Sequence, residues 1–259
     1  SRGLGDVYKR QAMIASDLTA LLPYSKKYFV VPEGKIVQLT AYHASLYELD
    51  GTKVEPEILE VSWNTDAAMK NGFPHFMMKE IHEQPRVVRD TLVGRMTPAG
   101  ELDIDELGLS LEELNDIDRV YVIACGTSYH AGLIAKNLIE GWARIPTEVE
   151  AASEFRYRNP IITPTTLVVA VSQSGETADT LAAIRDARIK GAKVFGITNV
   201  VGSPVARESD GVIYTKANKE IAVASTKSFL GQVVSLTLLA MLLGQAVGRM
   251  TGRQIKLLF

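Results

Sequence analysis

The segment "TLVVAVSQSGETADTLAAIRDARIKGAKVFGIT", residues 166–198, gives the clearest indication of the fold class. Residues 166–171 are almost all apolar, which is typical of a strand that is buried on both faces. The polar and small residues at 172–177 end that strand, and residues 178–190 then have the apolar spacing of an amphipathic helix. Residues 192–198 return to an apolar, β-branched run. A strand, a helix and a second strand in this order predict a parallel pair joined by a crossover helix.

The same alternation continues on both sides of this unit. "RVYVIAC" (119–125), "TEVEAA" (147–152) and "GVIYT" (211–215) predict strands, and "YHAGLIAKNLIEGW" (129–142) predicts a helix. The sequence therefore predicts an α/β domain with a doubly wound parallel sheet. Two apolar helix faces are expected to pack on this sheet. They are formed by Ile134, Leu138 and Trp142, and by Leu181, Ile184 and Ala187.

The composition is that of a soluble globular protein of one or two domains. Of the 259 residues, 46% are hydrophobic and 22% are charged, and the formal net charge is -2. This balance gives no reason to expect nucleic acid as a partner. The single cysteine, Cys125, excludes an internal disulfide and fits a reducing cytosol, and the sequence begins with no secretory signal. We therefore expect a cytoplasmic location.

The longest uncharged stretch runs for 21 residues, from Ser228 to Gly248. Its length is compatible with a membrane span. A helix that is apolar nearly all round is also typical of a buried core or a subunit interface. Because four polar side chains interrupt the stretch, we expect such a helix and no membrane as a partner. These side chains are Gln232, Ser235, Thr237 and Gln245.

Outside the α/β region the sequence divides into three shorter parts. Residues 1–12 have no periodicity and resemble a translated cloning adapter, so we interpret them as a non-native leader. Residues 13–62 hold the apolar runs "YFVV", "KIVQL" and "SLYEL", which predict antiparallel strands, the last pair forming a hairpin. Residues 63–118 form a polar connector with one helix, which Pro85 should kink or restart. The α/β domain occupies residues 119–259, and its end within a helical pattern predicts that the chain is a fragment.

Three clusters of hydroxyl side chains fall where a strand or a loop leads into a helix. They are "CGTS" (125–128), "SQSGET" (172–177) and "VAST" (223–226). In a doubly wound sheet, ligands bind outside the carboxyl ends of the strands. The N–H groups and the dipole of a helix N-terminus hold a phosphate without a cation, and Gly126 and Gly175 would let the backbone approach it. The clusters therefore predict a site for a phosphate monoester, with further donors left for sugar oxygens.

Ordinary helix capping is the alternative interpretation, because Ser and Thr are common N-caps. One cap needs one hydroxyl group, however, whereas "SQSGET" supplies three, and three such junctions in one sheet favour a site. Lys227 is either a surface lysine or a source of positive potential for an anion. Cys125 is either an activated thiol at a helix N-terminus or a small apolar residue.

The sequence contains no other cofactor or metal motif. It lacks G-x-x-x-x-G-K-[ST], and it has no G-x-G-x-x-G after a strand, so the common nucleotide-binding loops are not indicated. Its four histidines lack the spacing of metal ligands. They are His43, His75, His82 and His130. We therefore expect neither a cofactor nor a metal.

Four motifs, "CGTSYHAG", "ASEFRYR", "SQSGETADT" and "EIAVASTK", closely resemble the sugar isomerase (SIS) domain of the glutamine–fructose-6-phosphate aminotransferase (isomerizing) family, the glucosamine-6-phosphate synthases. "KEIHEQP" resembles that family's segment between its glutaminase and isomerase domains, and "IASDLTALLP" resembles the late part of its glutaminase domain. The resemblance covers nearly everything from Met13 to about Thr251. It implies that residues 13–62 are a β-rich remnant of a glutaminase domain with an N-terminal nucleophile.

The resemblance also implies a reaction and a set of binding residues. In the family, ammonia from glutamine is passed to fructose 6-phosphate, which becomes glucosamine 6-phosphate at the start of UDP-N-acetylglucosamine synthesis, and the enzyme is a homodimer. The phosphate would be bound by Ser172, Gln173, Ser174 and Thr177. The remaining contacts to phosphate and sugar would come from Thr127, Ser128, Val223 and Ser225.

The sequence departs from the family pattern in several respects. The N-terminal cysteine nucleophile, the glutamine-binding motifs and the second SIS subdomain, which carries the residues for ring opening and isomerisation, are absent. Asn218-Lys219 also stands where the family more usually has Gly-Pro. We therefore expect no catalytic residue in this chain, no synthase activity, and an apolar patch where the 228–248 helix is left partly uncovered.

Two alternatives to the aminotransferase family stay open. SIS domains also serve as sugar-phosphate sensors in transcription regulators, and other SIS isomerases or deglycases lack the glutaminase half. The predicted strands in residues 13–62 argue against both.

Overall fold

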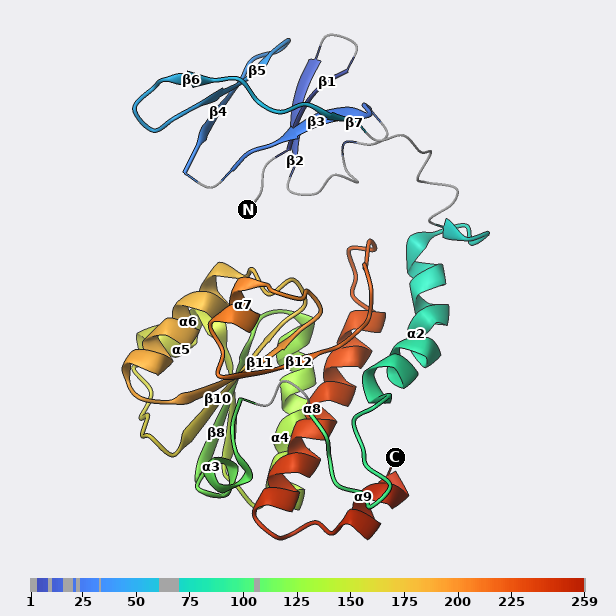
Figure 1. Cartoon of the computed structure of the whole chain (residues 1–259), viewed down its shortest axis with the longest axis vertical. Helices are drawn as coiled ribbons and strands as arrows, with labels where there is room; N and C mark the ends of the chain where they lie inside the picture. Colours follow the sequence, from blue (N-terminus) through green and yellow to red (C-terminus); the bar gives the residue numbers. More distant parts are fainter. Residues whose placement is uncertain are drawn as a thin grey trace. The chain divides into compact units, whose positions relative to one another are not determined.

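The computed structural model describes residues 4–8, 11–15, 21, 24–32, 34–60, 70–104 and 108–258 (Figure 1). The chain forms two compact units, Ser1–Gly72 and Phe73–Phe259. The helix that we predicted in the connector 63–118 begins at Phe76 and thus belongs to the second unit.

In its described residues the first unit is built mainly from antiparallel strands, as its apolar runs predict. The strands are β1 (Leu4–Tyr8), β2 (Gln11–Ala15), β3 (Lys27–Val30), β4 (Ile36–Leu39), β5 (Ala44–Tyr47), β6 (Lys53–Val54) and β7 (Leu59–Glu60). Four of them form a sheet in the order β2-β1-β3-β7, and three form a sheet in the order β4-β5-β6. β4 and β5 pair antiparallel, which confirms the predicted hairpin. Residues 4–8 lie in the predicted leader, yet β1 pairs with both β2 and β3, so this backbone is part of the sheet. That the leader is non-native stays a prediction.

The second unit is built on a five-stranded sheet in which every strand pairing is parallel. The strands are β8 (Arg119–Ala124), β9 (Thr147–Ala151), β10 (Thr166–Ser172), β11 (Lys193–Thr198) and β12 (Gly211–Tyr214). Their order in space is β12-β11-β10-β8-β9. The chain therefore moves outward from β8 to the edge strand β9, and then crosses back to build β10, β11 and β12 on the other side. This confirms the predicted doubly wound sheet and places its switch point between β8 and β10.

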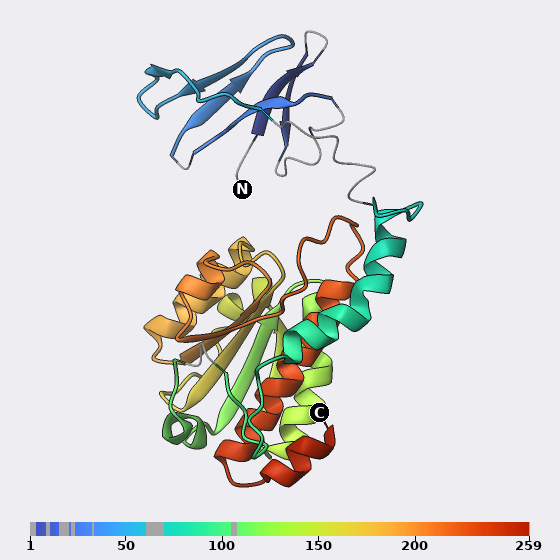
Figure 2. The same ribbon diagram turned by 45° about the vertical axis from the view of Figure 1, so that its right-hand side comes forward.

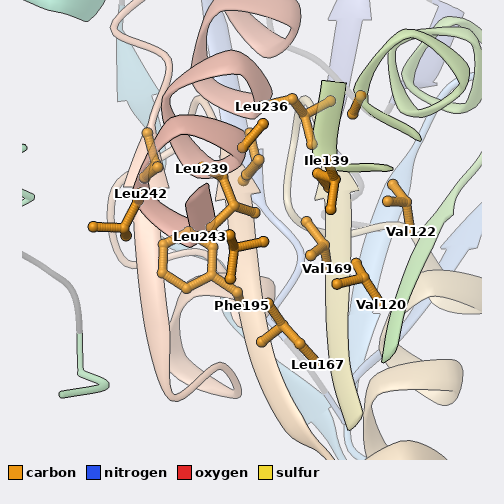
Figure 3. Packing of buried hydrophobic residues seen from close by; sticks show 14 of the residues in the cluster. Val120, Val122, Ile139, Leu167, Val169, Phe195, Leu236, Leu239, Leu242 and Leu243 are labelled. Atoms are coloured by element: carbon orange, nitrogen blue, oxygen red, sulfur yellow. The ribbon is translucent and has the colours of Figure 1, made fainter. Parts of the chain in front are cut away.

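Two helical layers cover the sheet (Figures 1 and 2). Alternate residues of each strand point to opposite faces, so Val120 and Val122 join one apolar core and Tyr121 and Ile123 join the other. The described helices of this unit are α2 (Phe76–Leu92), α3 (Leu111–Asn115), α4 (Thr127–Trp142), α5 (Ala152–Arg158), α6 (Ala178–Ile189), α7 (Pro204–Arg207), α8 (Lys227–Ala246) and α9 (Gly252–Leu258). The first core is filled from α4 and α8, whose Ile139, Leu239 and Leu243 pack on the strands (Figure 3). The second core is filled from α5, α6 and α7.

The inward face of α4 differs from the predicted one. Its buried side chains include Ala131, Ala135 and Ile139, whereas Ile134 is 42% exposed and Leu138 and Trp142 are only partly buried. Both sets recur at four-residue spacing. The small residues prevail because two alanines, and Gly132 beside them, let the helix approach the strands closely: a Cβ on Gly132 would lie 2.9 Å from a methyl group of Val122. The predicted inward face of α6 is largely right, with Ile184 and Ala187 buried.

The long apolar stretch forms α8, which is a core helix. By length and composition α8 is able to cross a membrane, but 61% of its most apolar window is buried in this structure. It packs between α4 and α2, and none of its residues is exposed. The expected apolar patch on this helix is therefore absent, because α2 covers the side that α4 and the sheet leave free. Pro85 lies inside α2, which continues as one helix through it without restarting.

Candidate functional site

The loops after β8 and β10 leave the sheet side by side at its switch point. Ala124, the last residue of β8, is opposite Val171, so the segments 125–128 and 172–177 start at the same level. The first leads into α4 on one face of the sheet and the second into α6 on the other. In folds of this kind the crevice between two such loops is where ligands bind.

The 172–177 loop is closed by its own hydroxyl groups. Ser172 Oγ accepts a hydrogen bond from the Gly175 N–H at 3.0 Å and lies 3.0 Å from Thr177 Oγ1. Ser174 Oγ accepts from the Glu176 N–H at 3.2 Å. A helix cap needs one hydroxyl group, and this loop has three, on Ser172, Ser174 and Thr177. Their hydrogen bonds shape the turn itself. Ser172 is buried beneath the turn.

Gly175 is required at its position for two reasons. Its φ of +66° is a left-handed conformation that L side chains rarely adopt, and a Cβ there would lie 2.1 Å from Ser203 Oγ and 2.8 Å from Thr198 Oγ1. The loop is braced from the same side by two backbone hydrogen bonds, in which the Val205 N–H donates to Gly175 and the Asn199 N–H donates to Gln173. The segment that follows β11 thus fixes the shape of this loop.

Capping does not account for the hydroxyl residues at the starts of α4 and α6. Thr177 is the N-cap residue of α6, but its hydroxyl group makes no capping hydrogen bond, and the N-cap residue of α4 is Gly126. Among the described residues, no side chain accepts from the N–H groups of residues 178–180. The first turn of α6 therefore presents unclaimed donors and a positive dipole end, which suit an anion.

The start of α8 is different, because a carboxylate already occupies it. Glu220 accepts hydrogen bonds from the Thr226 N–H at 2.9 Å and the Ser228 N–H at 3.1 Å, and from Ser225 Oγ at 2.9 Å. A negative charge on these donors leaves little affinity for a second anion. The sequence reasoning missed Glu220, and the local signal was an acidic residue a few positions before an expected helix start.

Lys227 is neither a surface lysine nor a free positive charge for an anion, which are the two interpretations that its sequence position left open. Only 3% of its side chain is exposed, and its Nζ lies 2.7 Å from Glu83 Oε2 of α2. Burial favours the neutral form of Glu83, but the hydrogen bond from Lys227 and the charges of Lys227 and Lys79 outweigh it, so the pKa of Glu83 lies below its ordinary value. The lysine charge is therefore balanced within the core.

The predicted site residues fall into two groups. One group lies at or just after the ends of the neighbouring strands β8 and β10, at the switch point: Thr127, Ser128, Ser172, Gln173, Ser174 and Thr177. Val223 and Ser225 lie instead on the segment that leads into α8, where the Val223 side chain is fully exposed and Ser225 is bound to Glu220. Cys125 is half-buried at the end of β8 and packs against the second core.

Two pockets of this unit lie away from the switch point. One, of about 530 Å³, is lined by α2 and by the loops after β11 and β12, and includes Arg86, Asn199 and Lys216. The other, of about 400 Å³, lies between the ends of α4 and α9. Neither is lined by the 172–177 loop, whose N–H donors suit a phosphate. In the described part of the chain, no group of three His, Cys, Asp or Glu residues is placed to hold a metal ion.

Comparison with known protein families matches residues 113–242 to the model described as the SIS domain. A glutamine–fructose-6-phosphate aminotransferase (isomerizing) of Symbiobacterium thermophilum is 52% identical over 248 residues, which are 95% of this chain and 40% of that relative. The enzyme of the same name from Clostridium tetani is 46% identical over 98% of this chain and 41% of its own length. The chain thus spans about two fifths of these relatives.

Solved structures agree with the match to the SIS domain. The C-terminal domain of glucosamine-fructose-6-phosphate aminotransferase from Francisella tularensis is 41% identical, with a TM-score of 0.68 over 72% of this chain and 52% of that one. A protein from Clostridium difficile, 19% identical with a TM-score of 0.60 over 70% of this chain and 49% of that one, shares the fold.

Proposed function

The chain belongs to the SIS domain family, and from this membership we propose that it is the sugar-phosphate-binding part of an enzyme that converts fructose 6-phosphate and glutamine to glucosamine 6-phosphate and glutamate. Support for the reaction comes from homology to the aminotransferases, which extends over nearly the whole chain. In this proposal other parts of the enzyme bind glutamine and carry the catalytic residues, the enzyme is a cytoplasmic homodimer, and no metal or cofactor takes part.

The phosphate binds at the start of α6, on the 172–177 loop. One observation carries this proposal: no described side chain accepts a hydrogen bond from the N–H groups in the first turn of α6. These groups lie beside a loop that Ser172 already closes and that the residues after β11 brace. Because the loop is formed in advance, binding costs little ordering of the chain. The Ser174 and Thr177 hydroxyl groups each add a donor to the anion.

The sugar extends from this phosphate towards the loop after β8. Thr127 is exposed in the first turn of α4, directly across the switch point, and its hydroxyl group is suited to a sugar oxygen. Ser128, in the same turn, is almost buried. Val223 and Ser225 complete the site from the segment before α8, where we expect Val223 to contribute through its backbone because its side chain points into solvent.

Calorimetric titration of the chain with fructose 6-phosphate tests this proposal. Replacing Ser174 and Thr177 together with Ala should weaken binding by about 2–4 kcal/mol, since each hydrogen bond to a charged group contributes about 1.5–3 kcal/mol and is partly compensated when lost. Ser172 stays in place because it holds the Gly175 N–H. Thr165→Ala, just before the opposite end of β10, is the matched control and should leave the affinity unchanged. Equal affinities for all three proteins would remove the 172–177 loop from the site.

A further inference from the structure

A buried carboxylate on α2 holds the backbone of the segment that leads into α8. Glu80 is 2% exposed. It accepts hydrogen bonds from the Ile221 N–H at 2.6 Å and from the Ala222 N–H at 3.2 Å. These residues are 141 and 142 positions away from Glu80 in the sequence, and they directly precede Val223.

The hydrogen bonds between Glu80 and the 221–222 backbone are needed because the Glu80 side chain is buried. Removing a carboxylate from water is costly unless hydrogen bonds or an opposite charge replace the water. Within the described residues, Glu80 has no ion pair, and the two backbone N–H groups are its only hydrogen-bond donors. The carboxylate thus depends on the 221–222 backbone, and that backbone has no other described hydrogen-bond acceptor.

The position of Glu80 is itself fixed, because α2 is attached to this region along its length. Lys227 at the start of α8 pairs with Glu83, one turn after Glu80. Further along, Thr91 Oγ1 donates to the carbonyl oxygen of Thr215 at 2.6 Å. Gly231 of α8 lets Val87 pack closely, since a Cβ there would lie 3.2 Å from Val87 Cγ1. α2 is therefore a rigid support from which Glu80 reaches the 221–222 backbone.

We propose that Glu80 is a positioning residue of the sugar-phosphate site, which places Val223 and Ser225 by holding the backbone immediately before them. This rests on the proposed function, because Val223 and Ser225 are assigned to the site there. Glu220 fixes the end of the same segment at the α8 N-terminus, and Glu80 fixes its middle. The phosphate loop at 172–177 is braced by other residues, so it does not depend on Glu80.

Because the 172–177 loop does not depend on Glu80, replacing Glu80 should change the affinities for two ligands differently. In Glu80→Gln, one side-chain oxygen becomes an amide nitrogen, which is a donor and repels a backbone N–H. If the segment then holds its binding-competent position about one tenth of the time, the affinity for fructose 6-phosphate falls about tenfold. The affinity for inorganic phosphate, which needs only the 172–177 loop, should stay unchanged. A loss of overall stability alone would not produce this split.

Calorimetry with both ligands on the full 259-residue chain measures the split. Asp90→Asn is the matched control, since it makes the same chemical change on the same helix in an exposed pair with Arg86, and it should bind both ligands like the unchanged chain. Equal fructose 6-phosphate affinity in Glu80→Gln and the unchanged chain would overturn the inference, as would a parallel loss for both ligands. If the unchanged chain binds neither ligand, the proposed function fails instead.

A second measurement needs no variant. In an NMR titration of the unchanged chain, the amide signals of Ile221 and Ala222 should shift with fructose 6-phosphate but not with inorganic phosphate. Signals that stay in place at saturating fructose 6-phosphate would contradict the role of Glu80, even if Glu80→Gln failed to fold.

Discussion

Replacing Gly175 with Ala should damage both the fold and the binding of sugar phosphate. The substitution forces an L residue to adopt a φ of +66° and places its Cβ 2.1 Å from Ser203 Oγ and 2.5 Å from Ser203 Cβ. The left-handed conformation costs about 1–2 kcal/mol. The overlap lies at the base of the loop, where Ser203 is buried, and relieving it should cost about 1–3 kcal/mol more, as for other overpacked sites. The second unit should therefore lose about 2–5 kcal/mol of stability.

Gly202→Ala separates the two contributions. Gly202 has almost the same φ, +69°, but nothing lies within 4 Å of its Cβ position. This variant should lose only the conformational part, about 1–2 kcal/mol. The difference between the two variants then measures the close approach of Gly175 to Ser203.

Urea unfolding followed by fluorescence is a suitable assay. The sequence contains two tryptophans, Trp63 and Trp142, and Trp142 is in α4. A Trp63→Phe background therefore reports on the second unit alone. Equal unfolding free energies for Gly175→Ala and Gly202→Ala would refute the close approach and, with it, the bracing of the phosphate loop by the segment after β11.

Three further predictions concern charge, metal and activity. Hydrogen bonds from Lys193, and then from the backbone and hydroxyl groups of Ser110, lower the pKa of Glu113 from 4.5 to about 2. The contribution of Glu113 to stability is thus complete above pH 4.5 and is lost as the pH falls towards 2. The difference in unfolding free energy between the unchanged chain and Glu113→Gln should therefore shrink over that range. A difference that does not vary with pH would contradict this. Excess chelator should leave fructose 6-phosphate affinity unchanged, because helix N–H groups hold the anion, and a loss of binding would reveal a metal. The chain incubated with glutamine and fructose 6-phosphate should yield neither glutamate nor glucosamine 6-phosphate, since its one thiol, Cys125, ends a core strand; glutamate release that Cys125→Ala abolishes would be the opposite result.

The second unit's fold was predictable because its strands are buried on both faces. Such strands are continuous apolar runs, and those of β8, β10 and β11 are visible in the sequence without any knowledge of their partners. The inward face of α4 was predicted wrongly, because Ile134 and Ala135 belong to equally regular patterns and hydrophobicity favours the larger residue. The alanine face packs on the sheet because the helix lies too close to the strands for larger side chains.

The residues that support the site were harder to predict, because they act across long sequence distances. The hydroxyl groups of the 172–177 loop are local, and their number alone pointed to more than a cap. Glu80 and Glu83 meet their partners more than 140 residues later, and no periodicity connects α2 with the start of α8. For the same reason Lys227 could not be assigned, since its ion pair is visible only in the folded chain.

In the function that we propose, sugar phosphate binds to the loop between β10 and α6. NMR titration of the isotopically labelled chain with fructose 6-phosphate tests this most directly, because it locates the ligand residue by residue. We predict the largest amide shifts at Gly175, Glu176 and Thr177, with smaller shifts at Thr127 and Ser128. Shifts confined to the pocket lined by Arg86, Asn199 and Lys216, with the 172–177 amides unmoved at saturation, would contradict binding at the 172–177 loop.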